Sequence, residues 1–123
     1  MTKNEFIPYE QALALKELGF DEPCIGYWNI DPYLPNPTFN LVKPFDHEWC
    51  IPAPLYQQAF RWFRDKHNLH GIVSYYGKNQ WDIELLDYKG NQLVEIENNT
   101  FWTYEEAELA CLNKLIEIIK NKV

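Results

Sequence analysis

The spacing of apolar residues changes period along the chain, and this change separates predicted helices from predicted strands. Three segments show the helical period of three to four residues: 8–18, 54–67 and a last one from Thr103 nearly to the C-terminus. Five segments have strand composition or an alternating pattern: 24–30, 38–42, 72–76, 81–85 and 92–97. Prolines surround the first two, so those strands are expected to be short or to lie at sheet edges.

The first and second predicted helices have recognisable ends. Pro8 suits a first helical turn, and Gly19 suits the left-handed residue that ends a helix at Leu18. In that ending, Phe20 packs back on Leu15 as the hydrophobic contact of a Schellman motif. The second helix carries one apolar face and is predicted to end at Asn68; the face comprises Leu55, Ala59, Trp62 and Phe63.

The last helix has a capping box at its start. Thr103 is the expected N-cap, and Glu106 stands three residues later, where its side chain completes the box. Trp102 and Ala107 occupy the two positions of a hydrophobic staple. Before this helix, turns at 77–79 and 89–91 are predicted to join the last three strands into a meander.

These elements predict one α+β domain over residues 1–123, in the order α-β-β-α-β-β-β-α. Because short turns join neighbouring strands, we expect a mainly antiparallel sheet with the helices packed on one face. No stretch approaches the roughly 18 apolar residues of a membrane-spanning helix, and no secretory leader precedes the first helix. We therefore expect a cytoplasmic protein.

Charge and cysteine content limit the function classes. The formal net charge is −7, which disfavours general DNA or RNA binding because phosphate contacts depend on Lys and Arg. Cys24, Cys50 and Cys111 are an odd number of widely spaced cysteines, so they fit neither a disulfide framework nor a zinc site. We interpret them as reduced thiols, and we predict no cofactor.

Three stretches carry a resemblance to other proteins: Phe6–Leu13 with Leu18-Gly19-Phe20, then Pro54–Arg64, and finally Tyr104–Glu108. They resemble a group of short uncharacterised proteins encoded by bacteriophages, prophages and gut Bacteroidetes genomes. The likeness covers the three helices. It implies an accessory protein of phage or mobile-element origin, located in the host cell cytoplasm if it is phage-encoded, and assigns a role to no residue.

The second helix holds the densest cationic and aromatic segment of this acidic chain. Arg61 and Arg64 are three residues apart, so both guanidinium groups could reach one phosphate or carboxylate. Trp62 or Tyr56 would offer a stacking plane, and the candidate ligand-binding set is completed by His67 and His70. The competing interpretation is that Trp62 belongs to the core and that the arginines pair with nearby acids.

Two other groups suggest catalysis or metal binding only weakly. His67 and His70, with His47, Glu48 and Cys50 earlier in the chain, lack the ligand spacing of a zinc site. A second group of carboxylates, near the predicted hairpin, resembles a nuclease cluster but lacks its lysine: Asp82, Glu84 and Asp87. We predict neither a metal site nor a catalytic site, and an enzyme is the less favoured class.

Aromatic residues, at 16% of the chain, exceed what a small core readily hides. Five of them are candidates for an exposed interaction surface: Tyr27, Trp28, Tyr33, Tyr75 and Tyr76. The leading hypothesis is a non-enzymatic accessory protein that binds a host or phage macromolecule through an acidic and aromatic surface. A nucleotide-like small molecule is the alternative ligand, and self-association into a homo-oligomer is left open.

Overall fold

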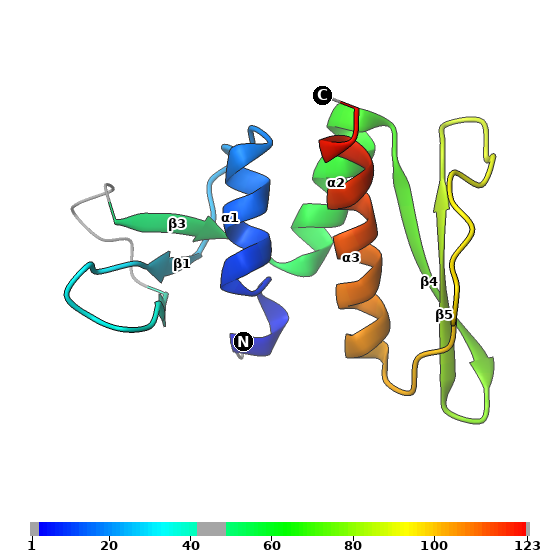
Figure 1. The fold of residues 1–123 in the computed structure, drawn as a ribbon, viewed down its shortest axis with the longest axis horizontal. Coiled ribbons are helices and arrows are strands. Elements are labelled where there is room, and N and C mark those ends of the chain that lie inside the picture. The colour runs from blue at the N-terminus through cyan, green and yellow to red at the C-terminus, as the bar shows by residue number, and fades with distance from the viewer. Residues whose placement is uncertain (1–2, 42–48, 123) are drawn as a thin grey trace. The chain divides into compact units, whose positions relative to one another are not determined.

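The computed structural model describes residues 3–41 and 49–122 (Figure 1). Its contacts divide the chain into two compact units, Met1–Gln58 (unit 1) and Ala59–Val123 (unit 2). Each unit combines helix with antiparallel sheet, so the chain is α+β as predicted. Among the described residues, no helix is both long and apolar enough to cross a membrane. That the whole chain forms a single domain stays a prediction.

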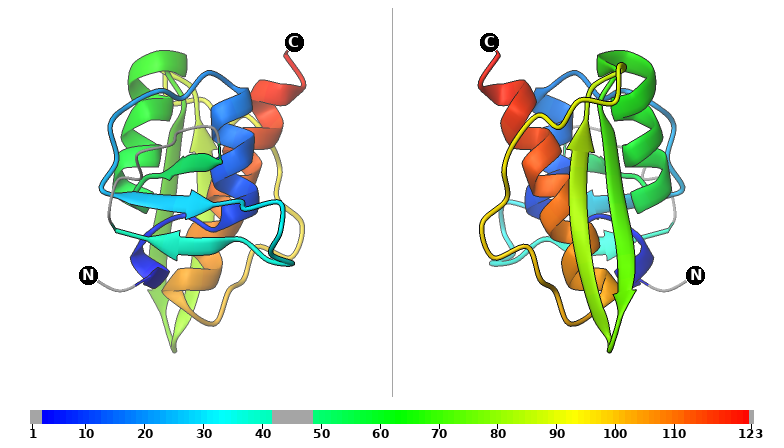
Figure 2. Two further views of the ribbon diagram at one scale, coloured as in Figure 1. Left: turned by 90° about the vertical axis from the view of Figure 1, so that its left-hand side faces the viewer. Right: turned by 90° about the vertical axis from the view of Figure 1, so that its right-hand side faces the viewer.

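The described residues of unit 1 form a short 3-10 helix, the helix α1, a three-stranded sheet and the start of α2 (Tyr56–His67). The elements are η1 (Lys3–Glu5), α1 (Tyr9–Glu17), β1 (Gly26–Asn29), β2 (Thr38–Asn40) and β3 (Cys50–Ala53). The strands are antiparallel in the order β2-β1-β3, which the left view of Figure 2 shows face-on. β1 and β2 confirm the two predicted strands, although Val42 lies outside the described residues.

β3 is the strand that the sequence pattern did not predict. It includes Pro52, which has no N–H to donate to a strand ladder. β3 tolerates this residue because it lies at the edge of the sheet, where only one side of the strand is paired.

The end of α1 confirms the predicted Schellman motif. Gly19 has a φ of +102°, and its N–H donates to the Lys16 carbonyl at 3.1 Å. The Phe20 N–H donates to the Leu15 carbonyl at 2.9 Å. Leu15 and Phe20 are both buried, so the local ending of the helix is also part of the core of unit 1.

Aromatic side chains fill the core of unit 1. The Phe39 ring contacts the rings of Phe6 and Trp28, with centroids 4.8 and 5.4 Å apart. A Cβ atom at Gly26 would lie 2.8 Å from atoms of the Phe6 and Phe39 rings. Glycine is therefore required at this position of β1 because the two rings occupy the space of a side chain.

α2 (Tyr56–His67) begins at the end of unit 1, and the rest of it belongs to unit 2. Unit 2 also contains β4 (His70–Gly77), β5 (Gln80–Leu86) and α3 (Tyr104–Lys120). β4 and β5 form an antiparallel hairpin, visible in the right view of Figure 2. One face of the hairpin packs against α3, whose Cys111, Leu112 and Leu115 are buried.

The helix ends in unit 2 largely follow the prediction. Asn68 has a φ of +54° just after α2, and the Thr103 hydroxyl accepts a hydrogen bond from the Glu106 N–H at 3.1 Å. Of the two residues of the predicted staple, Ala107 is fully buried and Trp102 is 61% exposed. The contact between them stays a prediction. The tight turn between β4 and β5 is confirmed, with Lys78 and Asn79 at φ values of +56° and +57°.

The predicted third strand of the meander, 92–97, is not a strand. Only an isolated bridge between Leu86 and Gln92 and a hydrogen bond from the Leu93 N–H to the Leu85 carbonyl follow the expected pairing. Further along, the side chain of Asn99 hydrogen-bonds both backbone groups of Ile83, in the position that a paired strand would occupy. Unit 2 therefore has a two-stranded hairpin with a loop along its β5 edge.

Candidate functional site

The candidate ligand site on α2 has its arginines at the surface and its aromatic rings in the interior. Arg61 and Arg64 are both exposed. Because residues three apart are neighbours on a helix surface, the two arginines lie on the same side of α2. Trp62 and Tyr56 are only 3% and 9% exposed, and the Trp62 ring lies edge-on to His67 at 4.9 Å. The predicted stacking plane for an anion is therefore not available from these two residues.

The histidines of the same candidate site lie at the junction of α2 and β4. His67 ends α2, and burial, with a smaller contribution from the Lys122 charge, lowers its pKa. His70 is half-buried at the start of β4. Across residues 3–41 and 49–122, no three His, Cys, Asp or Glu side chains gather closely enough to hold a metal ion. His47 and Glu48 lie outside the described residues.

The carboxylates of the nuclease-like group have structural positions. Asp82 and Glu84 alternate with the buried Ile83 and Leu85 along β5, so they belong to its opposite face. The Asp87 carboxylate accepts hydrogen bonds from two backbone N–H groups of the following turn, Lys89 and Asn91, each at 2.9 Å. The Asn91 bond is the main reason that the pKa of Asp87 is lowered. This carboxylate closes a turn.

Cys24 and Cys111 are protonated thiols at neutral pH. Burial raises the pKa of Cys24 and of Cys111 to about 12 in each case, and neighbouring carboxylates add to the effect. Because the thiolate is the nucleophilic form, neither sulfur is activated near neutral pH. Cys50 is buried, with 6% of its surface exposed.

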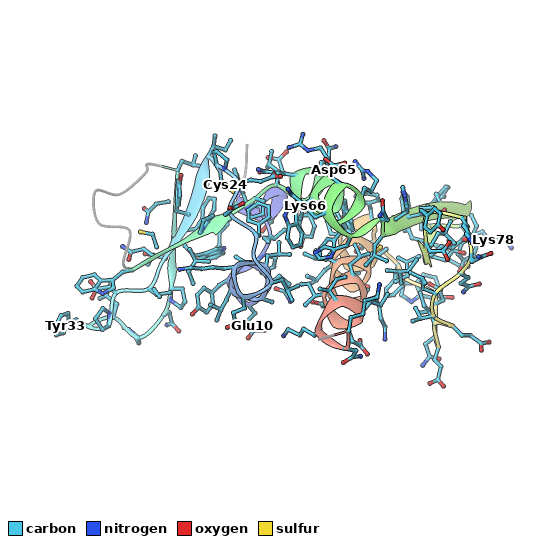
Figure 3. All side chains as sticks on the ribbon, turned by 90° about the horizontal axis from the view of Figure 1, so that it is seen from above. Glu10, Cys24, Tyr33, Asp65, Lys66 and Lys78 are labelled. Atoms are coloured by element: carbon cyan, nitrogen blue, oxygen red, sulfur yellow. The ribbon has the colours of Figure 1, made fainter. Side chains whose placement is uncertain are left out.

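The aromatic residues proposed for an interaction surface divide between the two units. In unit 1, Trp28 is buried, and its indole N–H donates to the Ile7 carbonyl at 3.0 Å. Tyr27 is half-buried, and Tyr33 is 87% exposed at the outer loop between β1 and β2, where Figure 3 labels it. Trp28 therefore belongs to the core and was wrongly included in the predicted surface.

In unit 2, Tyr75 belongs to a group of three rings that we call the aromatic cluster: Tyr75, Trp81 and Tyr104. The Tyr75 and Trp81 centroids are 4.7 Å apart, and Trp81 meets Tyr104 edge-on at 5.2 Å. Tyr75 is 53% and Tyr104 41% exposed, although both contact the half-buried Trp81. Tyr76 is 50% exposed, and its hydroxyl lies 3.1 Å from that of Thr100.

Trp81 and Tyr104 were not predicted as site residues from the sequence. Trp81 had a usable signal, because the predicted turn at 77–79 sets the hairpin register that places it opposite Tyr75. No signal in the sequence indicates that Tyr104 joins the cluster, because its position depends on how α3 packs on the hairpin. Trp102, also missed, is 61% exposed just before this helix.

Two carboxylates, those of Glu105 and Glu108, interact electrostatically with Tyr104 of the aromatic cluster. Glu105 and Glu106 lie in the first turn of α3, and Glu108 hydrogen-bonds the Tyr104 side chain. Burial raises the pKa of Glu108, and the Tyr104 bond only partly offsets this effect. Burial and the carboxylates also raise the pKa of Tyr104, so its hydroxyl stays protonated at neutral pH. The site combines exposed ring surface with negative charge.

One open depression, of about 360 Å³, is lined by Gln92, Leu93, Val94 and Glu95, a set without an aromatic ring. It does not provide the aromatic walls that the small-molecule hypothesis expects. Comparison with known proteins assigns no family to the chain: no family model, no curated protein and no solved structure matches it.

Proposed function

We propose that the protein is a non-enzymatic accessory protein that binds another protein through the aromatic cluster and its flanking carboxylates. The observation that carries this proposal is the exposure of two tyrosine rings, Tyr75 and Tyr104, held against the indole of Trp81. Large aromatic side chains that stay exposed in a fixed arrangement are typical of binding surfaces.

Ring contacts favour binding because they reduce the entropy lost on complex formation. Trp81 sits between the two tyrosines, and the Tyr75 hydroxyl also accepts a hydrogen bond from the Asn79 N–H at 3.2 Å. A partner would therefore meet side chains that are already ordered, and only its own groups would lose freedom.

The charge of the surface favours a partner with arginine or lysine side chains. Glu105 and Glu108 interact electrostatically with Tyr104 of the aromatic cluster, and the whole chain has a net charge of −7. A cation can contact both a carboxylate and a ring face, and a guanidinium group can stack on the ring. Host and phage proteins with basic surfaces are the first candidates, on the expectation that the protein is phage-encoded.

The proposal is tested with peptides that differ only in charge. A fluorescent peptide of alternating arginine and glycine should bind the full chain, and the same peptide with citrulline, which is nearly isosteric and uncharged, should bind at least about tenfold more weakly. Fluorescence anisotropy measures both affinities at low and at physiological salt. Equal affinities for the two peptides would contradict a cation-binding role for the surface.

Tyrosine variants locate the binding surface. Tyr104→Ala and Tyr75→Ala should each weaken arginine-peptide binding by about tenfold or more, in the range of important interface residues. Tyr88→Ala is the matched control, because Tyr88 is 70% exposed in the same unit but contacts Lys89 and not the aromatic cluster. If Tyr88→Ala weakens binding as much as Tyr104→Ala, the assignment of the surface is wrong.

The alternative function, binding of a nucleotide-like small molecule through Arg61 and Arg64, has less support. Trp62 and Tyr56 are buried, so the site lacks the two rings on which a base was expected to stack. Thermal unfolding with and without nucleotides tests it, because a ligand of the folded state raises the unfolding temperature.

A further inference from the structure

The outer edge of β5 is closed by the loop that follows it. Trp81 exchanges two backbone hydrogen bonds with Phe101, both at 2.8 Å. The Asn99 side chain accepts from the Ile83 N–H and donates to the Ile83 carbonyl, both at 2.9 Å. The Leu85 carbonyl accepts from the Leu93 N–H. No further strand can therefore pair with this side of β5.

These bonds also determine which backbone groups of β4 point outward. Because Trp81, Ile83 and Leu85 direct their N–H and C=O groups to the loop, the residues between them bond to β4. In the register of the hairpin those residues pair with His70, Ile72 and Ser74. The intervening β4 residues, Gly71, Val73 and Tyr75, therefore present their N–H and C=O groups at the other edge, and no described strand pairs with it.

Apart from a register irregularity between Tyr75 and Gly77, at its far end, the β4 edge lacks the features by which proteins protect edge strands. From His70 to Gly77 there is no proline and no Asp, Glu, Lys or Arg. The side chains of the sheet that face the helices are also less buried at this edge than on β5. Val73 is only half-buried, whereas Ile83, its neighbour on β5, is 1% exposed. Ile72, on the opposite face, is 38% exposed.

We propose that a second copy of the chain pairs antiparallel with the β4 edge, which makes a four-stranded sheet across a two-fold axis at Val73. In this register Val73 faces Val73 of the second copy, and Gly71 faces Tyr75. The three outward residues of each strand would each donate and accept one bond, so about six backbone hydrogen bonds form.

The charges of unit 2 favour this antiparallel arrangement of identical strands. α2 leads into the start of β4 and carries Arg64 and Lys66 in its last turn. At the other end of β4, the contact between Trp81 and Tyr104 brings the first turn of α3, with Glu105 and Glu106, to the hairpin.

Both helices lie on one face of the sheet, because the missing side chain of Gly71 faces Phe60 of α2 and Cys111 of α3. Antiparallel pairing about Val73 therefore places the basic end of each copy toward the acidic end of the other. The strands themselves carry no like charges that would oppose each other.

The test measures the molar mass and the protection of individual amides in the full chain. Sedimentation equilibrium from about 1 to 500 μM should show an approach to twice the 14.7 kDa of one chain. Residue-resolved hydrogen exchange should show protection of the Gly71, Val73 and Tyr75 amides that rises with protein concentration. The His70, Ile72 and Ser74 amides should be protected at every concentration because they bond within the hairpin.

Val73→Pro should abolish the dimer, because it removes an outward N–H and no hydrogen bond of the hairpin. A second variant, Ile72→Lys with Ser74→Lys, covers the case in which proline unfolds the strand. In the dimer each new ammonium group would face one from the other copy, whereas within the hairpin the two face Glu84 and Asp82. This variant should stay folded and be monomeric. Both variants leave Trp81 and Tyr104 in place, so peptide binding tests the proposed function separately.

Three results would overturn the proposal. The first is a mass of one chain at every concentration. The second is a dimer that persists in a folded Val73→Pro or in the double lysine variant. The third is concentration-independent protection of the Val73 amide, which would mean that the chain itself covers the β4 edge.

Discussion

Replacing Asn99 by alanine removes both hydrogen bonds between the loop and the centre of β5. The Asn99 amide bonds the N–H and the C=O of Ile83, each at 2.9 Å and in a partly buried position. The Ile83 side chain beneath is 1% exposed. Alanine therefore leaves two backbone groups beside the core without their partner, and we expect the free energy of unfolding to fall.

The magnitude follows from the two bonds. Each contributes roughly 0.5–1.5 kcal/mol net, so Asn99→Ala should cost about 2 kcal/mol, and less where water reaches the freed groups. With a urea dependence of about 2 kcal/mol per molar for a small protein, the unfolding midpoint should fall by about 1 M at an unchanged slope. Urea titrations followed by far-UV circular dichroism and tryptophan fluorescence measure this shift.

Two further variants make the test specific. Asn99→Asp keeps the oxygen that accepts from the Ile83 N–H but places a second oxygen against the Ile83 carbonyl, so it should destabilise at least as much as alanine. Asn36→Ala, at an exposed asparagine in the loop between β1 and β2, should change stability by less than about 0.5 kcal/mol. If Asn99→Ala has an effect as small as Asn36→Ala, the side chain does not replace a strand and the reasoning fails.

Three further predictions concern packing, thiol reactivity and pH. Gly71→Ala should cost about 1–3 kcal/mol, because its Cβ would lie 2.8 Å from Cys111 Sγ, and Cys111→Ala in the same chain should recover part of that cost. Strictly additive urea-unfolding energies would contradict this contact. At pH 8 a thiol reagent should label Cys24 and Cys111 quickly only after unfolding, because burial raises the pKa of each thiol to about 12. Rapid labelling of either residue in the folded chain, located by peptide mapping, would contradict this. Glu108→Gln should be more stable than the parent at pH 7, because burial raises the pKa of Glu108 above its ordinary value of 4.5 and so disfavours the ionised form in the folded state. That advantage should shrink as the pH falls toward the raised pKa, and a difference independent of pH would show that another interaction is responsible.

The residues at element ends were the most predictable part of this protein. Gly19 and Thr103 act through hydrogen bonds to residues within five positions along the chain, so their roles could be recognised in the sequence. The turn at Lys78 and Asn79 is equally local, and it sets which residues of β4 and β5 face each other.

The candidate site was only half predictable. The turn register implies that Tyr75 and Trp81 are cross-strand neighbours, but Tyr104 reaches them only because α3 returns to the hairpin after a loop of irregular structure. Trp28 and Tyr33 have similar sequence surroundings, rich in aromatic residues and proline, yet one is buried and the other is 87% exposed. Exposure of a single ring depends on distant residues that pack on it, and hydrophobicity does not distinguish the two cases.

By itself, the sequence determined the three helices, the hairpin and the α+β class, because periodicity, caps and turns act over a few residues. Tertiary structure alone decided that β3 pairs with β1 despite Pro52, and that 92–97 is a loop although it alternates like a strand. Both outcomes depend on hydrogen-bond partners far along the chain. The backbone N–H and C=O of Ile83 find their partners in the side-chain amide of Asn99, which takes the place of a neighbouring strand.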